Sequence, residues 1–143
     1  MKILVIKAST DTTVQRLFGE LDKIENKEME CLIQHSQFDR YQKMYPYINF
    51  VDIRKERFEN LPICVINKIS KKRYDKLFVT LTGVHVYHFW NVMELVNRIH
   101  FRQAFFYNCN GEKLQIPKKR ILKDLLCKAY INWIIFIDRL RAD

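Results

Sequence analysis

The stretch KILVIKASTDTTV, residues 2–14, decides the fold. Its first part, KILVIKA (2–8), is a short run of continuous aliphatic residues, which is typical of a strand buried on both faces. A turn rich in hydroxyl groups, STDTT (9–13), comes next. From Thr12 on, the apolar residues follow helical spacing: Val14, Leu17, Phe18, Leu21 and Ile24. A strand, a polar turn and a helix form the opening unit of an α/β protein.

The rest of the chain repeats this unit. Strands are predicted at 29–35, 48–53, 75–83 and 102–109, and helices at 37–45, 61–75, 87–100 and 117–143. Apolar strands that alternate with helices predict a doubly wound, Rossmann-like α/β fold with a mainly parallel sheet. We expect five strands in the order 3-2-1-4-5, helices on both faces, and EKLQI (112–116) as a candidate for a short extra strand.

The composition is that of one globular domain, which we expect to span residues 1–143, with a core over 1–115 and a basic, apolar helix over 117–143. Hydrophobic residues make up 48% of the chain and charged residues 29%. No stretch approaches the roughly 18 apolar residues of a membrane span, and no signal peptide is recognised. Four widely spaced cysteines without a CxxC pair predict reduced thiols in a cytoplasmic protein. No metal or cofactor is expected.

The charge is uneven along the chain. Residues 1–60 carry ten Lys/Arg and ten Asp/Glu, whereas residues 61–143 carry fifteen and six. The whole net charge of +9 therefore lies in the second part, which includes two KKR clusters at 71–73 and 118–120. These clusters form either a solvated surface or a site for a polyanion. A nucleic-acid binder should place both on one face with aromatic residues between them, but no recognised binding module fits, so nucleic acid is not the expected partner.

A ligand crevice is expected where the first and fourth strands diverge, outside their carboxyl ends. Small, polar or ionisable residues follow the predicted strands there, and we predict that they bind substrate: Ser9, Thr10, Thr12, Thr13, Gly83, His85, His88, Asn108 and Asn110. No glycine-rich phosphate loop is present, since the chain has three glycines. A phosphate can instead sit on a helix N-terminus, held by backbone N–H groups and hydroxyls.

Asp11 is the one carboxylate in the first turn. It is the candidate general base, because such a base is a carboxylate close to the proton that it removes. The alternative is that Thr10 or Asp11 caps the helix, where the helix dipole favours an acidic side chain. His85 and His88 form an HxxH pair without a third ligand nearby, so structural or solvent-facing roles are favoured over a metal site. His100 is expected at a helix C-terminus.

The last helix contains AYINWIIFI (129–137), which is apolar except for Asn132. This segment is too short to cross a bilayer. It packs on the sheet and supplies a contact to a partner protein or a homodimer, or it forms an interfacial helix with basic flanks. The second alternative predicts peripheral contact with the inner face of the membrane.

The residues MKILVIKAST, followed by INKISKKRYDKLFVTLTG (66–83), resemble the first domain of the heptosyltransferase family. These glycosyltransferases act on lipopolysaccharide cores in bacteria and have the two-domain GT-B fold. The resemblance covers residues 1–115, which correspond to the acceptor-side domain, and Tyr74, Asp75 and Gly83 match by layout. It implies binding of a sugar nucleotide or a sugar acceptor, and a donor-binding partner that completes the transferase.

The sequence departs from the family at its proposed catalytic base. The family's Gly-Asp pair falls on Thr12 and Thr13, so Asp11 lies two residues before the expected carboxylate. Three interpretations follow. The chain is half of a glycosyltransferase for cell-envelope polysaccharide, a non-catalytic module that binds a sugar, a nucleotide or a protein, or a nucleic-acid-binding doubly wound domain.

Overall fold

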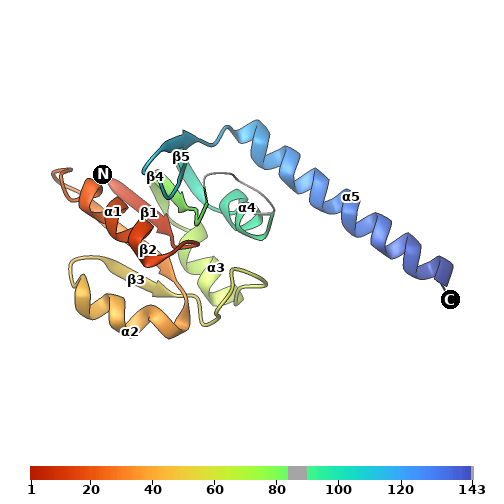
Figure 1. The fold of residues 1–143 in the computed structure, drawn as a ribbon, viewed down its shortest axis with the longest axis horizontal. Coiled ribbons are helices and arrows are strands. Elements are labelled where there is room, and N and C mark those ends of the chain that lie inside the picture. The colour runs from red at the N-terminus through yellow and green to blue at the C-terminus, as the bar shows by residue number, and fades with distance from the viewer. Residues whose placement is uncertain (84–89, 143) are drawn as a thin grey trace.

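The computed structural model describes residues 1–83 and 90–142 and contains one six-stranded sheet in the order β3-β2-β1-β4-β5-β6 (Figure 1). Five strands run parallel and the last pairs antiparallel with its neighbour. The strands are β1 (Lys2–Ile6), β2 (Glu28–Ile33), β3 (Asn49–Asp52), β4 (Arg73–Thr80), β5 (His100–Tyr107) and β6 (Lys113–Gln115). The predicted fold class and strand order are confirmed, and β6 extends the five expected strands to six.

The helices alternate with the parallel strands. They are α1 (Asp11–Leu21), α2 (His35–Met44), α3 (Ile63–Ser70), α4 (Trp90–Asn97) and α5 (Lys118–Ala142). The helix predicted over 61–75 ends at Ser70, because Tyr74 pairs with Phe101 in the sheet and is buried. His100 was expected to cap a helix, and this prediction is wrong. It begins β5 opposite Arg73, since the parallel ladder between β4 and β5 extends to this residue.

The sheet has a hydrophobic core on each face. Leu4 and Ile6 of β1 pack with residues of α3 and α4, whereas Ile3 and Val5 pack with α1 and α2. All four side chains are fully buried. Successive residues of a strand point to opposite faces, so a strand covered on both sides must be apolar throughout. This explains the unbroken ILVI run.

Only the start of α5 packs on the domain. Ile121 is buried and Leu125 is partly buried against the core that includes α4. Lys128 donates to Glu94 Oε2 at 2.5 Å and to Asn91 Oδ1 at 3.1 Å. Beyond this point the helix leaves the domain, as Figure 1 shows. The second half of α5 therefore does not cover the sheet. Among the helices of the described residues, none has the length and apolar content of a membrane span.

Candidate functional site

The structure places the described members of the predicted site at the carboxyl edge of three neighbouring strands. Residues 9–13 follow β1, Gly83 follows β4, and Asn108 and Asn110 follow β5. Thr10 and Thr12 are exposed, Ser9 is half-buried and Thr13 is buried. His85 and His88 lie outside the described residues. The common edge follows from the parallel strands, as the sequence predicts.

Asp11 is held by three donors, two from α2 and one from the turn after β1. Tyr41 Oη donates to Asp11 Oδ1 at 2.7 Å, Arg40 Nη2 donates to Oδ2 at 2.5 Å, and Lys7 Nζ lies 3.2 Å from Oδ1. Burial alone would raise the pKa of Asp11, but the hydrogen bonds from Tyr41, Arg40 and Lys7 outweigh it and lower the pKa. A carboxylate with a lowered pKa accepts a proton weakly. In this structure Asp11 ties the turn after β1 to α2, and its catalytic role stays a prediction.

The turn before α1 is not capped by a side chain. Thr10 is the N-cap residue, but its side chain makes no capping hydrogen bond. Its hydroxyl lies 3.3 Å from the Thr13 hydroxyl instead. Asp11 is the first helical residue, and its carboxylate is committed to α2 and Lys7. Thr10 is therefore the N-cap residue and Asp11 an acidic residue of the first turn, as predicted, but neither side chain makes the capping hydrogen bond, because both have other partners.

Asn108 closes the turn between β5 and β6. Its Oδ1 accepts from the backbone N–H groups of Asn110, at 3.1 Å, and Glu112, at 2.9 Å. Its Nδ2 donates to Glu112 Oε2 at 2.6 Å. The side chain is fully buried. These hydrogen bonds give the buried Asn108 side chain a structural role in the turn, whereas Asn110 is exposed at the tip of the turn.

A crevice lies at the carboxyl edge of the sheet, close to the predicted turn. We call it the carboxyl-edge crevice; its volume is about 240 Å³. The ends of β1 and β2, the loop between β3 and α3, and the start of α4 contribute its lining residues: Ala8, Gln34, Glu56, Arg57, Phe58, Glu59, Asn91 and Val92. Of these, only Ala8 adjoins the predicted site residues in sequence. Sequence reasoning missed Gln34 and residues 56–59 because they follow β2 and β3, away from the switch between β1 and β4, while Asn91 and Val92 belong to α4 and not to the loop after β4.

One residue that lines this crevice, Gln34, has a buried side-chain carbonyl oxygen without a donor. Gln34, which lines the crevice, donates through Nε2 to the Lys7 carbonyl at 3.1 Å. Its Oε1, and the Oε1 of Gln37 one turn later in α2, have no hydrogen-bond partner among the described residues. An unsatisfied buried acceptor costs about 1–3 kcal/mol, so such groups normally meet a water or a ligand. The Gln34 oxygen therefore gives the crevice one acceptor that a donor group of a ligand can satisfy, whereas Gln37 is not among the residues that line the crevice.

The charged side chains that line the crevice differ in whether they have partners within the protein. Glu56 accepts from the backbone N–H of Ser36 at 2.9 Å and from its hydroxyl at 2.6 Å. Arg57 is exposed and, within residues 1–83 and 90–142, makes no ion pair. The crevice lining thus combines the unsatisfied acceptor of Gln34 with an arginine that is available to an anion, beside the carboxylates of Glu56 and Glu59.

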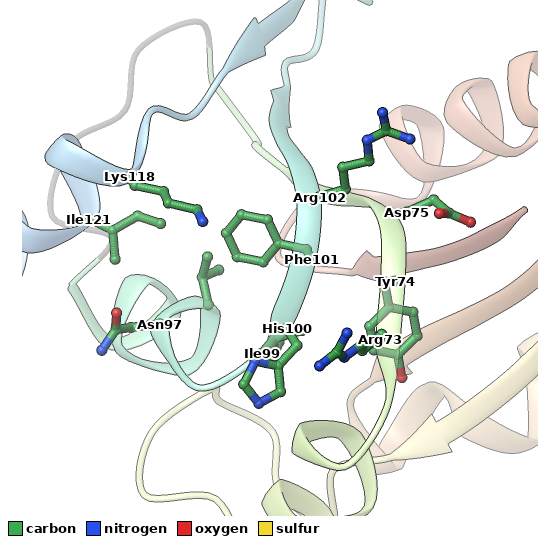
Figure 2. A pocket seen from close by; sticks show the side chains of 11 residues that line it. Arg73, Tyr74, Asp75, Asn97, Ile99, His100, Phe101, Arg102, Lys118 and Ile121 are labelled. Carbon is green, nitrogen blue, oxygen red and sulfur yellow. The ribbon is translucent and has the colours of Figure 1, made fainter.

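A larger pocket lies at the opposite edge of the sheet (Figure 2). We call it the amino-edge pocket; it has a volume of about 580 Å³ and lies where β4, β5 and α5 begin and α4 ends. Arg73, His100, Arg102 and Lys118 contribute basic groups. Figure 2 shows the Lys118 side chain pointing toward the Phe101 ring, with His100 close to Arg73.

The two KKR clusters meet at this pocket, because Arg73 belongs to the first and Lys118 to the second. The one carboxylate among the lining residues, Asp75, accepts from the backbone N–H of Lys2 at 2.8 Å. Neither Arg73 nor Lys118 has an ion pair within the described part of the chain. The signal in the sequence was the pair of basic clusters, but their meeting depends on the start of α5 folding back onto α4.

Comparisons with protein-family models, with curated proteins and with solved structures find no match to this chain. The heptosyltransferase resemblance therefore stays a prediction.

Proposed function

We propose that this Rossmann-like domain binds a sugar phosphate or a sugar nucleotide in the carboxyl-edge crevice. The observation that carries the proposal is the buried side-chain carbonyl oxygen of Gln34, which lines the crevice and lacks a donor. A sugar supplies hydroxyl donors for this oxygen, and its phosphate carries the negative charge that Arg57 can pair with. The crevice also lies where doubly wound sheets bind their ligands.

We further propose that this binding serves sugar transfer, with the domain acting as the acceptor-side half and a partner domain or subunit holding the donor. Support comes from the strand order and from the layout of Tyr74, Asp75 and Gly83. In such a reaction a base removes the proton of the acceptor hydroxyl, whose oxygen attacks the anomeric carbon as the nucleotide leaves with inversion. Asp11 can act as this base only after Arg40 and Lys7 release its carboxylate, so we assign binding, and not catalysis, to the chain alone.

Binding can be tested with a panel of sugar phosphates and sugar nucleotides. A ligand at 100 times its Kd stabilises the folded protein by about 2.7 kcal/mol, which a thermal-shift screen detects. Arg57→Gln removes the available cation and should weaken binding about tenfold or more, as a charge-assisted hydrogen bond is worth about 1.5–3 kcal/mol. Arg102→Gln is the matched control, since Arg102 lines the pocket at the opposite edge. If no member of the panel binds, or if both variants lose equal affinity, the proposal fails.

The amino-edge pocket favours a second candidate function, the binding of a nucleic acid or another polyphosphate. Its specific support is that Arg73 and Lys118, from separate clusters, line one pocket with the aromatic ring of Phe101. Basic groups interleaved with an aromatic ring are typical of single-strand binding surfaces. Fluorescence anisotropy with a labelled single-stranded oligonucleotide, measured over a series of salt concentrations, tests it.

For this candidate the roles of the two variants are reversed. Arg102→Gln should weaken oligonucleotide binding and reduce the slope of log K against log salt by about 0.7. Arg57→Gln should leave both unchanged. Absence of binding at low salt would remove nucleic acid from consideration and would leave the sugar-ligand proposal untouched.

A further inference from the structure

The second half of α5 exposes large apolar side chains along one face. Figure 1 shows this segment projecting away from the sheet and from the other helices. Six side chains form what we call the α5 stripe, and each is 58% to 63% exposed: Leu122, Leu126, Tyr130, Trp133, Phe136 and Leu140. Monomeric soluble proteins rarely expose a contiguous apolar patch of this extent, and those that do use it for interaction.

The α5 stripe is separate from the face that docks on the domain. Its members recur at intervals of three or four residues, so they share one side of the helix. At 100° per residue, this side is turned about a third of a turn from Ile121, Leu125 and Lys128, which face the domain. The stripe runs for about 27 Å along the helix. Docking on α4 therefore leaves the stripe free over its whole length.

Charge indicates what covers the stripe. Basic residues precede and follow the apolar segment 129–137, and residues 117–143 carry seven Lys/Arg against three Asp/Glu. A second copy of this chain would bring a net charge of +9 against an equal charge, which opposes association. An anionic surface would instead attract the basic residues on both sides of the apolar segment. Trp133 and Tyr130 carry amphipathic rings of the kind enriched at membrane–water interfaces.

We propose that α5 binds the surface of an anionic lipid bilayer and lies in the plane of the interface. The α5 stripe enters the boundary between headgroups and acyl chains, and the flanking Lys and Arg side chains contact lipid phosphates. The apolar segment is too short to span the roughly 30 Å hydrocarbon core, so the helix lies on the membrane and does not cross it. The first turns stay docked on α4 and hold the domain beside the bilayer. This inference does not depend on ligand binding in the crevice.

Vesicle flotation with the full chain tests the proposal. Vesicles of pure phosphatidylcholine are compared with vesicles that contain phosphatidylglycerol. The wild-type protein should float with the anionic vesicles and should bind the neutral ones at least tenfold more weakly. The double variant Trp133→Glu/Phe136→Glu should lose anionic binding by tenfold or more. Ile63→Glu is the matched control, because Ile63 is equally apolar and 76% exposed, but lies in α3; it should bind as the wild type does.

Three results would overturn the proposal. The first is no flotation with either vesicle. The second is equal binding to neutral and anionic vesicles, which would contradict the role of charge. The third is a dimer in light scattering that the double variant dissociates while vesicles fail to bind, which would assign the α5 stripe to a second copy. Circular dichroism and thermal unfolding show whether the double variant keeps its fold, as expected for side chains that the domain does not bury.

Discussion

The Asp11→Asn substitution is the sharpest test of how the turn after β1 is held. It removes one negative charge and changes the shape of the side chain little. The ammonium of Lys7, whose side chain is 2% exposed, then loses its ion-pair partner at 3.2 Å. Its remaining contacts are the Ser9 carbonyl at 3.1 Å and the ring of Tyr41, whose centroid lies 5.4 Å away.

The expected loss of stability can be bounded from both sides. Removing one partner of a buried ion pair costs about 3–5 kcal/mol, whereas an exposed pair contributes at most about 1 kcal/mol. Lys7 is buried, but the Asp11 side chain is 35% exposed and is partly screened by solvent. We therefore expect a loss of about 2–3 kcal/mol, in addition to the weakened bonds from Arg40 and Tyr41. At about 3 °C per kcal/mol for a chain of this length, the Tm should fall by roughly 6–9 °C.

Urea unfolding at pH 7, with calorimetry beside it, measures the effect. Asp39→Asn is the control, because Asp39 is exposed on α2, and it should change the free energy of unfolding by less than about 0.5 kcal/mol. Adding Lys7→Met to Asp11→Asn removes the stranded ammonium and should recover part of the loss. If Asp11→Asn unfolds within about 0.5 kcal/mol of the wild type, the ion-pair reasoning is refuted.

The pH dependence provides a second check on Asp11. The pKa of Asp11 is lowered in the folded state from its ordinary value of 3.8. Its stabilising contribution is therefore complete above that value and is lost as the pH falls through it toward the folded pKa. The difference between wild type and Asp11→Asn should shrink on acidification from pH 5. A difference that stays constant down to pH 2 would contradict the pairing.

Three further predictions concern other parts of the fold. Glu30→Gln should cost about 1–3 kcal/mol in urea unfolding at pH 7, because three donors, Tyr74 among them, hold this carboxylate and outweigh burial to lower its pKa; an unchanged midpoint would contradict this. The hydrogen bond to Asp52 raises the pKa of His35, so NMR titration should find that pKa above 6.5 in the wild type and closer to 6.5 in Asp52→Asn. The contribution of this pair to stability is lost as the pH rises through the pKa of His35 in the folded protein. Ellman's reagent should modify the three exposed thiols of the native protein, whereas Cys31, whose pKa burial raises, should react only after unfolding.

The sequence predicts the fold well because the decisive signals are local. Burial on both faces leaves no polar position in Ile3–Ile6, so this apolar run indicates a sheet that is covered by helices on both sides. The apolar periodicity of α1 likewise matches the buried Val14, Leu17, Phe18 and Leu21. The strand order is that of a doubly wound sheet, in which the order reverses beside the first strand. The sixth strand is harder to predict, since β6 has three residues, all of them exposed.

The candidate site is less predictable because its contacts join distant parts of the chain. Asp11 contacts Arg40 and Tyr41, which are 29 and 30 residues away in the sequence, and no sequence pattern within the first turn predicts these contacts. Gln34 and Arg57 come to one crevice only through the path of the loop after β3. The amphipathic pattern of α5 likewise shows that one face is apolar, but not that most of the helix leaves the domain.

Ion pairing explains why the net charge is available to partners. In the first 60 residues most carboxylates form ion pairs with cations of the same chain, as Asp11 does with Lys7 and Asp22 with Lys27. Lys118 at the amino-edge pocket and the Arg139 and Arg141 side chains of α5 make no ion pair within the described residues. A polyanion is therefore steered to the amino-edge pocket and to α5, and the attraction is screened by salt.

Salt should accordingly separate the proposed interactions. A hydroxyl group that bonds to the side-chain carbonyl of Gln34 adds no net charge, so added salt should weaken sugar binding in the crevice only through the Arg57 contact. Oligonucleotide or vesicle binding depends on several cations and should fall steeply between 50 and 200 mM salt, by about 10³-fold when six phosphates are contacted. Measuring the crevice ligand and the anionic vesicles in one buffer series checks this. Equal salt slopes for the two would mean that both bind through the same basic surface, and the division between the two edges of the sheet would be wrong.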